Sequence, residues 1–261
     1  MNPNTSPTPL FDRLRFVLVE TSRAGNVGSA ARAMKTMGFS DLVLVCPRDP
    51  NVLQDAEAIA LASGATDVLA RARIVDSLDE ALSGCHFSAA LSARLREFSP
   101  PQYEPRALAA QLACDEGLKA ALVFGNERFG LSNEQVGKCS ALVTVPANPA
   151  YSSLNLSQAV QVLAYECRMA ALDEPRSSSG IGFRGQPAGS EQIEGMFRHL
   201  EQALVEIEFL DPANPKKLMP RLRRLFARTQ LEVEEVNILR GIATQLIERR
   251  QRIRKPSGSA D

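Results

Sequence analysis

Short apolar runs alternate with longer amphipathic stretches over roughly the first two thirds of the chain. Strands buried on both faces of a parallel sheet appear in a sequence as nearly unbroken apolar runs. Five runs fit this description, and a weaker sixth accompanies them: 15–19, 42–46, 87–91, 121–124 and 142–145, with 73–75 as the sixth. Since helix-like stretches separate these runs, the pattern predicts an α/β domain with a parallel sheet covered by helices.

The predicted helices of this domain are 28–37, 55–62, 77–82, 105–113 and a short one that starts near Ser132. Ser77 and Glu80 have the spacing of a capping box, and Gly38 and Gly84 stand where C-terminal caps belong. These signals fix the expected helix ends.

A longer helix, 154–172, is expected to close the domain. Its apolar residues fall on one face at helical spacing: Leu156, Ala159, Val160, Leu163 and Cys167. This face must pack either on the rest of its own chain or on a partner.

The composition changes to Gly, Ser, Pro and Arg over 173–190, which indicates a flexible linker between a domain at 1–172 and a second one at 191–261. Three amphipathic stretches follow the linker, at 191–208, 215–228 and 233–252. They predict a small all-helical C-terminal domain, with Leu222 and Leu225 in its core. The end of the chain, 256–261, is expected to be disordered.

Charge matters through its distribution, because the net formal charge of the chain is zero. Cations gather in two blocks that are almost free of acids, 216–228 and 249–255. Such blocks are typical of phosphate-binding surfaces, and a solvated helix face accounts for them equally well.

The composition also excludes several classes of protein. No signal peptide and no run of membrane-spanning length is visible, so we expect a cytoplasmic protein. The five cysteines are scattered without a CxxC pair, which favours reduced thiols over structural zinc. With His86 and His199 as the only histidines, histidine-dependent triads and multi-histidine metal sites are nearly excluded.

Polar loops follow the predicted strands, and in open parallel sheets such loops bind ligands. The first strand is followed by ETSRAGNVGSAARAMKTMG, which we interpret as a glycine-rich turn that feeds a helix. Its Gly25 and Gly28 lack the GxGxxG spacing, and no GK[ST] follows, so a nucleotide-binding oxidoreductase is disfavoured. Arg32, one helical turn further on, is placed either to bind an anion or to form a surface salt bridge.

Loops after three later strands, LSAR (91–94), FGNERFGLSNE and PANPAYSSLNLS, are expected at one end of the sheet. Together, GNVGSAARAMKTMG, FGNERFGLS and NPAYSSLNLSQAVQVLAYE closely resemble the three signature motifs of the SPOUT class, in its branch of tRNA 2'-O-ribose methyltransferases. RLRRLFART and EVNILRGI are similar to the C-terminal helices of the TrmJ type. The resemblance covers nearly the whole chain.

This resemblance implies transfer of a methyl group from S-adenosyl-L-methionine to the first nucleotide of the tRNA anticodon loop, a cytidine or uridine. It also implies a SPOUT fold with a C-terminal deep trefoil knot, an obligate homodimer and chemistry that needs no metal. The knot could not be predicted from the sequence pattern itself, since knots are nearly absent among folds.

The resemblance places the methyl donor among three loops, where backbone groups read its adenine ring. The implied cofactor-binding residues are Leu91, Ser92, Ala93, Gly125, Asn126, Glu127, Val145, Ala147, Ser152, Ser153 and Leu154. Leu91 departs from the polar residue expected there. Ser152 and Ser153 are also suited to cap the helix that follows.

The implied catalytic residues are Arg32, Ser153 and Asn155. Because a guanidinium keeps its proton at ordinary pH, we interpret Arg32 as a clamp on the phosphate beside the target ribose, with Ser153 orienting the hydroxyl. Asn26 is expected to brace the first motif. Glu127 is expected to bond loop amides or Arg32 of the partner subunit, and a purely structural role is equally open.

The C-terminal domain is expected to grip the tRNA through its phosphates, which position the RNA without reading its sequence. The substrate-binding residues proposed there, besides Asn26 and Arg32, are Lys216, Lys217, Arg221, Arg223 and Arg224. Two alternatives remain open: an enzyme of the same class that acts on ribosomal RNA, and a tRNA-binding protein without catalysis.

Overall fold

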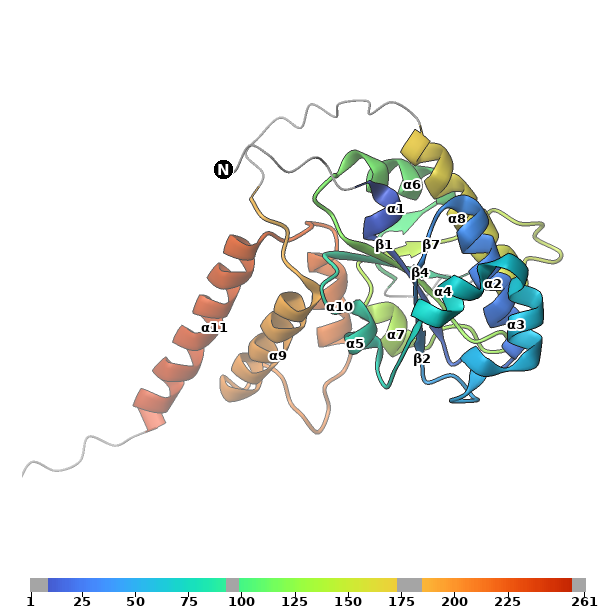
Figure 1. Ribbon diagram of the computed structural model, residues 1–261. Coiled ribbons are helices and arrows are strands. Elements are labelled where there is room, and N and C mark those ends of the chain that lie inside the picture. The colour runs from blue at the N-terminus through green and yellow to red at the C-terminus, as the bar shows by residue number, and fades with distance from the viewer. Residues whose placement is uncertain (1–8, 93–98, 173–184, 255–261) are drawn as a thin grey trace, which may run out of the picture.

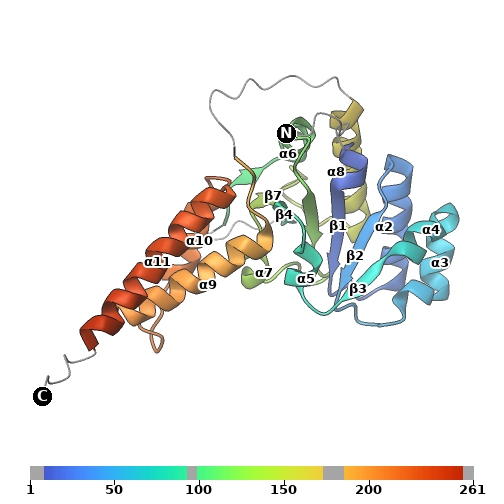
Figure 2. The ribbon, with the colours of Figure 1, turned by 60° about the vertical axis from the view of Figure 1, so that its left-hand side comes forward.

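The computed structural model describes residues 9–92, 99–172 and 185–254. Its centre is a seven-stranded sheet in the order β3-β2-β1-β6-β4-β7-β5, in which every pair of neighbouring strands is parallel. Three further helices, within 190–254, lie beside one side of the sheet part (Figures 1 and 2). The predicted parallel α/β architecture with a helical C-terminal region is confirmed.

All six predicted strands are present, with ends shifted by at most two residues. The strands are β1 (Leu14–Val19), β2 (Asp41–Val45), β3 (Arg73–Val75), β4 (Phe87–Leu91), β5 (Gln102–Tyr103), β6 (Ala120–Phe124) and β7 (Ala141–Val143). The strand β5 was not predicted, because a two-residue edge strand is too short to form an apolar run.

Helices cover both faces of the sheet. They are α1 (Leu10–Arg13), α2 (Ala24–Met37), α3 (Ala56–Ala62), α4 (Thr66–Arg71), α5 (Leu78–Leu82), α6 (Pro105–Cys114), α7 (Asn133–Gly137) and α8 (Leu156–Leu172), with short 3-10 turns η1 (Val52–Gln54) and η2 (Ser63–Ala65). The large buried cluster contains residues of α2, α4, α6 and α8, whereas α5 and α7 contribute to the cluster on the opposite face.

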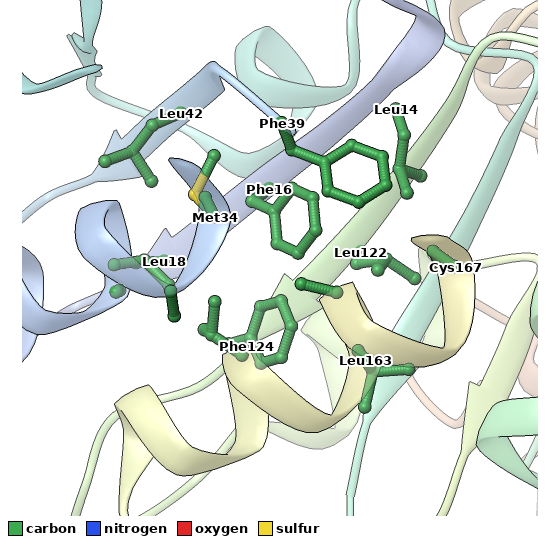
Figure 3. Close-up of a cluster of buried hydrophobic side chains, with 14 of the residues drawn as sticks. Leu14, Phe16, Leu18, Met34, Phe39, Leu42, Leu122, Phe124, Leu163 and Cys167 are labelled. Atoms are coloured by element: carbon green, nitrogen blue, oxygen red, sulfur yellow. The ribbon is translucent and has the colours of Figure 1, made fainter. Parts of the chain in front are cut away.

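The strand β1 shows how the two clusters are divided. Phe16 and Leu18 point into the large cluster, and Val17 and Val19 point into the smaller one. This alternation is expected of a central strand with both faces buried. Figure 3 shows Phe16 packed close to Phe39 and Phe124, with Leu163 and Cys167 of α8 to the right of Phe124.

The apolar face of α8 is buried within its own chain. Its five predicted apolar residues all belong to the large cluster, where α8 lies against α2 and α6. Of the two explanations for this face, packing inside the chain is therefore the correct one. The helix begins at Leu156, two residues later than predicted.

The helix α2 starts earlier than predicted, because Gly25 and Gly28 lie inside it. Our interpretation of these glycines as a ligand-binding turn is wrong. A Cβ atom on Gly28 would lie 2.0 Å from the backbone oxygen of Ala58 on α3. Because glycine has only a hydrogen atom in place of a side chain, Gly28 lets α2 and α3 approach each other closely.

The predicted helix caps are largely present. The Ser77 hydroxyl accepts the Glu80 N–H, but the Glu80 carboxylate accepts from the N–H of Asp76 and leaves the predicted capping box half formed. Gly38 has a φ of 91° at the end of α2, a conformation that L side chains disfavour. Gly84, with a φ of 74°, follows the end of α5.

Three helices follow residue 185: α9 (Ser190–Glu206), α10 (Leu218–Phe226) and α11 (Val233–Arg254). A small cluster that includes Met196, Phe197 and Val236 holds them together. Leu222 packs against this cluster as predicted, whereas Leu225 is 53% exposed, so its predicted place in the core is wrong.

Contacts with the sheet part fix the start of α9, since the N–H and hydroxyl of Ser190 both donate to the carbonyl of Cys85. Most of the predicted linker, 173–184, and the predicted tail, 256–261, lie outside the described residues. Within the described ranges, no helix is both long and apolar enough to cross a membrane.

Candidate active site

A pocket of about 300 Å³ opens at the carboxyl edge of the sheet, where the loops after β4, β6 and β7 meet. Nine of the predicted cofactor-binding residues line it: Leu91, Ser92, Gly125, Asn126, Glu127, Val145, Ser152, Ser153 and Leu154. Ala147 does not line this pocket, and Ala93 lies outside the described residues.

Seven further residues that were not predicted also line the pocket: Phe124, Arg128, Phe129, Gly130, Leu131, Leu156 and Ala159. Five of them adjoin Gly125, Asn126 and Glu127 in the chain. Their place in the FGNERFGLS motif was the signal that could have identified them. Leu156 and Ala159 open α8 and were assigned to the core alone.

The loop after β6 folds back tightly on itself. A Cβ atom on Gly125 would lie 2.3 Å from the carbonyl carbon of Gly130 and 2.4 Å from the nitrogen of Leu131. Only glycine fits such a backbone contact. The Asn126 side chain accepts the N–H of Arg128 (2.9 Å) and donates to the carbonyl of Glu20 (2.6 Å), so it ties the loop to the end of β1.

The Glu127 carboxylate holds the amino end of α2. Its Oε2 accepts the N–H (2.9 Å) and the hydroxyl (2.8 Å) of Ser22. Its Oε1 accepts the amide Nδ2 of Asn26 (2.9 Å) and the N–H of Arg23 (3.3 Å). Burial raises the pKa of Glu127, but these hydrogen bonds outweigh it and leave the pKa below its ordinary value.

A second hydrogen bond joins the first and third motifs. The Nδ2 of Asn155 donates to the Oδ1 of Asn26 (3.0 Å), so Glu127, Asn26 and Asn155 form a chain of hydrogen bonds that joins the three motifs. The Oδ1 of Asn155 accepts the N–H (2.9 Å) and hydroxyl (2.7 Å) of Ser157. Asn155 therefore caps α8, where the sequence suggested Ser152 or Ser153, and Ser153 remains exposed in the pocket.

The structure does not bring Arg32 to this pocket. Arg32 is exposed on α2 and is not among the lining residues. It lies six residues beyond Asn26, about 9 Å along the helix at 1.5 Å per residue. Among the described residues its side chain makes no ion pair, so the alternative of a surface salt bridge is not supported.

The predicted phosphate-binding cations divide into two groups. Arg221 and Arg224 lie on α10 and are exposed, and Lys217, at helical spacing from Arg221, immediately precedes the helix. Lys216, just before the helix, is also exposed.

Arg223 belongs to the interior side of α10. Its Nη2 donates to the Oε2 of Glu194 (2.9 Å), and its guanidinium lies 4.5 Å from the ring centroid of Phe197. Both partners are on α9. Arg223 is therefore a packing residue in this fold, and its prediction as an RNA contact is not supported.

The pocket suits a small ligand held mainly by loops. Its walls combine apolar side chains such as Leu91 and Val145 with the hydroxyls of Ser152 and Ser153. Within the described ranges, no three His, Cys, Asp or Glu side chains gather as metal ligands. The fold and site define an α/β enzyme that binds its small ligand in loops at the carboxyl edge of a parallel sheet.

Comparison with known proteins identifies the family. The SpoU rRNA methylase family matches residues 13–165, and the C-terminal domain of the tRNA methyltransferase TrmJ matches residues 191–257. The chain is 48% identical over 245 residues to the tRNA (cytidine/uridine-2'-O-)-methyltransferase TrmJ of Pectobacterium atrosepticum, covering 91% of this chain and 98% of that protein. The TrmJ of Yersinia pestis is 47% identical over 91% of this chain and 92% of its own length.

A solved structure supports the same assignment. The crystal structure of TrmJ from Z. mobilis is similar with a TM-score of 0.76 and 34% identity, over 89% of this chain and 98% of that one. The chain belongs to the SpoU methylase family, in its TrmJ branch. The resemblance stated from the motifs is confirmed.

Proposed function

We propose that this protein transfers a methyl group from S-adenosyl-L-methionine to a ribose 2'-hydroxyl in the tRNA anticodon loop, at the first nucleotide, a cytidine or uridine. The observation that carries the proposal is the pocket at which the loops after β4, β6 and β7 converge. The relatives with matching length are named tRNA (cytidine/uridine-2'-O-)-methyltransferases, which supplies the substrate class.

The pocket residues fit the methyl donor. Leu91, Val145 and Leu156 offer an apolar surface for an adenine ring, and Ser92 and Ser152 offer polar groups for the ribose. When bound, S-adenosylmethionine supplies an electrophilic methyl group. The loops hold it in place, because an in-line displacement depends on the alignment of the two reacting atoms.

Ser153 and Asn155 are proposed to position the target ribose. Ser153 is exposed in the pocket, where its hydroxyl can orient the 2'-hydroxyl. Asn155 acts through its hydrogen bond to Asn26, which holds the third motif against the first. Because Arg32 lies outside the pocket of its own chain, we assign the phosphate clamp to Arg32 of the partner subunit.

The proposed homodimer is supported by the outer side of α8. Tyr165, Met169 and Leu172 are exposed at helical spacing on this helix, opposite its buried face. Exposed apolar stripes of this kind mark association surfaces. The knot implied by the family would lie in the segments that carry the second and third motifs.

The remaining helices are proposed to form the tRNA-binding domain, 191–261, which is joined through 173–190 to the methyltransferase domain, 1–172. The exposed cations of α10, with Arg221 and Arg224 among them, support this role. We place the protein in the cytoplasm, where tRNA is modified, and its five free cysteines support a reducing compartment.

The direct test is transfer of a labelled methyl group from S-adenosylmethionine to unmodified tRNA transcripts, with the modified nucleoside identified by mass spectrometry. We expect the label in a 2'-O-methylated pyrimidine of the anticodon loop, and loss of transfer in Arg32→Ala. Lys35→Ala, an exposed change on the same helix, is the matched control.

Transfer to ribosomal RNA and not to tRNA would contradict the substrate assignment and favour the ribosomal alternative. Binding of tRNA without any methyl transfer would favour a noncatalytic binder.

A further inference from the structure

The outer face of α11 carries an apolar patch. Ile238 and Ile242 lie one helical turn apart and are 63% and 52% exposed. On the other side of the helix, Val236 and Ala243 are buried where α11 packs against α9. Figures 1 and 2 both show α11 as the outermost element on its side of the molecule. The helix thus has two apolar sides, and the described residues cover one of them.

Charge changes sign along this same face. At 100° per residue, Glu234, Glu235, Gly241, Gln245 and Arg249 fall in one stripe with the two isoleucines, and all five are exposed. The stripe is acidic at its amino end, apolar in the middle and basic at its carboxyl end. Arg250 points elsewhere, because it is paired with Glu208.

When two copies of this stripe run antiparallel, the acidic end of each faces the basic end of the other. We propose that the exposed face of α11 pairs antiparallel with the same face of α11 in a second copy of the chain, about a two-fold axis near Ile242. In a two-fold interface, residue i meets residue j and j meets i. Glu235 and Arg249 lie at equal distances on either side of Ile242, so each meets its opposite charge in the partner.

The apolar centre of the stripe fits this arrangement. Ile242 meets its own counterpart at the axis, and Ile238 meets the partner's Gln245. Gly241 lies beside the axis, and an added Cβ there would have no heavy atom within 4 Å, so its surroundings in one chain are open. Small residues at a crossing point let two helices approach closely.

The same features argue against RNA as the occupant of this face. Nucleic acid favours a continuous positive surface, whereas Glu234 and Glu235 make the amino half of the stripe acidic. Two isoleucines per copy give a contact well below the roughly 1,200 Å² of a stable independent interface. The pairing therefore rests on the homodimer proposed above, which holds two copies at high effective concentration.

The test is disulfide trapping in the full chain, after the exposed Cys46 and Cys114 are replaced by serine. Under mild oxidation, Ile242→Cys should form a covalent dimer more than about tenfold faster than Arg240→Cys, an exposed control on another side of α11. Arg249→Glu should slow trapping through Ile242→Cys, and Glu235→Arg added to it should restore the rate. Because Glu235 also caps α11 by accepting the N–H of Glu232, Glu235→Arg with Arg249 unchanged is the control for loss of the cap.

Sedimentation of the same chains separates the two proposals. A dimer in which the cysteines at 242 and 240 react equally would overturn the α11 pairing alone. A monomeric full chain would overturn both the α11 pairing and the homodimer. Failure of the charge reversal to rescue trapping would also contradict the antiparallel register.

Discussion

The sheet part and the helical part of this protein are stabilised differently. The large cluster under α2, α6 and α8 is continuous and contains fully buried residues such as Phe16 and Leu163, and the pocket is built on it from loop backbones. The cluster of α9, α10 and α11 has five buried residues and depends in addition on ion pairs such as Arg223 with Glu194. We assign the cofactor site to the sheet part with its large buried cluster, and the charge-based binding of tRNA to the helical part with its small one.

The largest effect should come from closing the space at Gly125. Gly125→Ala places a methyl group against the backbone of Gly130 and Leu131. We expect a loss of about 3 kcal/mol in cofactor binding, or about 100-fold in Kd, measured by titration calorimetry with S-adenosylmethionine. Gly137→Ala, where an added Cβ meets nothing within 4 Å, should bind normally. Equal affinities for the two variants would show that the loop can relax.

The next effect concerns Glu127. Glu127→Gln keeps the shape of the side chain but removes the negative charge that accepts four hydrogen bonds, from Ser22, Arg23 and Asn26. We therefore expect a loss of about 1–2 kcal/mol in the free energy of unfolding near neutral pH. Glu134→Gln, whose side chain is 81% exposed, is the control.

The stabilisation of the fold by Glu127 should decrease as the pH falls. Because its folded pKa is depressed, its stabilisation is fully present above the ordinary value of 4.5 and is lost as the pH falls through the folded pKa. Denaturation of wild type and Glu127→Gln between pH 3 and pH 7 should show the two curves converging at the acid end. A constant difference across this range would mean that the carboxylate charge has no part in the stabilisation.

A similar loss is expected in the helical part at Arg223. Removing one partner of a partly buried pair leaves the other without its counter-charge, so Arg223→Ala should lower stability by about 1–3 kcal/mol. Hydrogen exchange of α9 and α10 would measure it, with the sheet amides unaffected. Arg228→Ala, an exposed change just after α10, should leave exchange unaltered, and the same protection in both variants would contradict the packing role of Arg223.

The smallest effect is expected at the exposed face of α10. Arg221→Ala and Arg224→Ala should each weaken tRNA binding by about three- to tenfold and lower the salt dependence by about one unit of slope. Arg71→Ala, an exposed change on α4, is the control. An unchanged salt slope would remove α10 from the RNA-binding surface.

The sequence predicted those features that depend on local pattern. The apolar runs located six strands, and the motif FGNERFGLS located the loop that lines the pocket. The sequence did not predict contacts between residues that are far apart in the chain. Nothing local shows that Gly28 faces Ala58, that Arg223 pairs with Glu194, or that Asn155 reaches Asn26.

We assign cofactor binding to the sheet part and tRNA binding to the helical part, and the most direct test is to measure both affinities in the same two variants. We predict that Gly125→Ala loses S-adenosylmethionine binding and keeps tRNA binding, whereas Arg221→Ala combined with Arg224→Ala loses tRNA binding and keeps the cofactor. If each variant lost both ligands to the same extent, the assignment of the two functions to two separate regions would be contradicted.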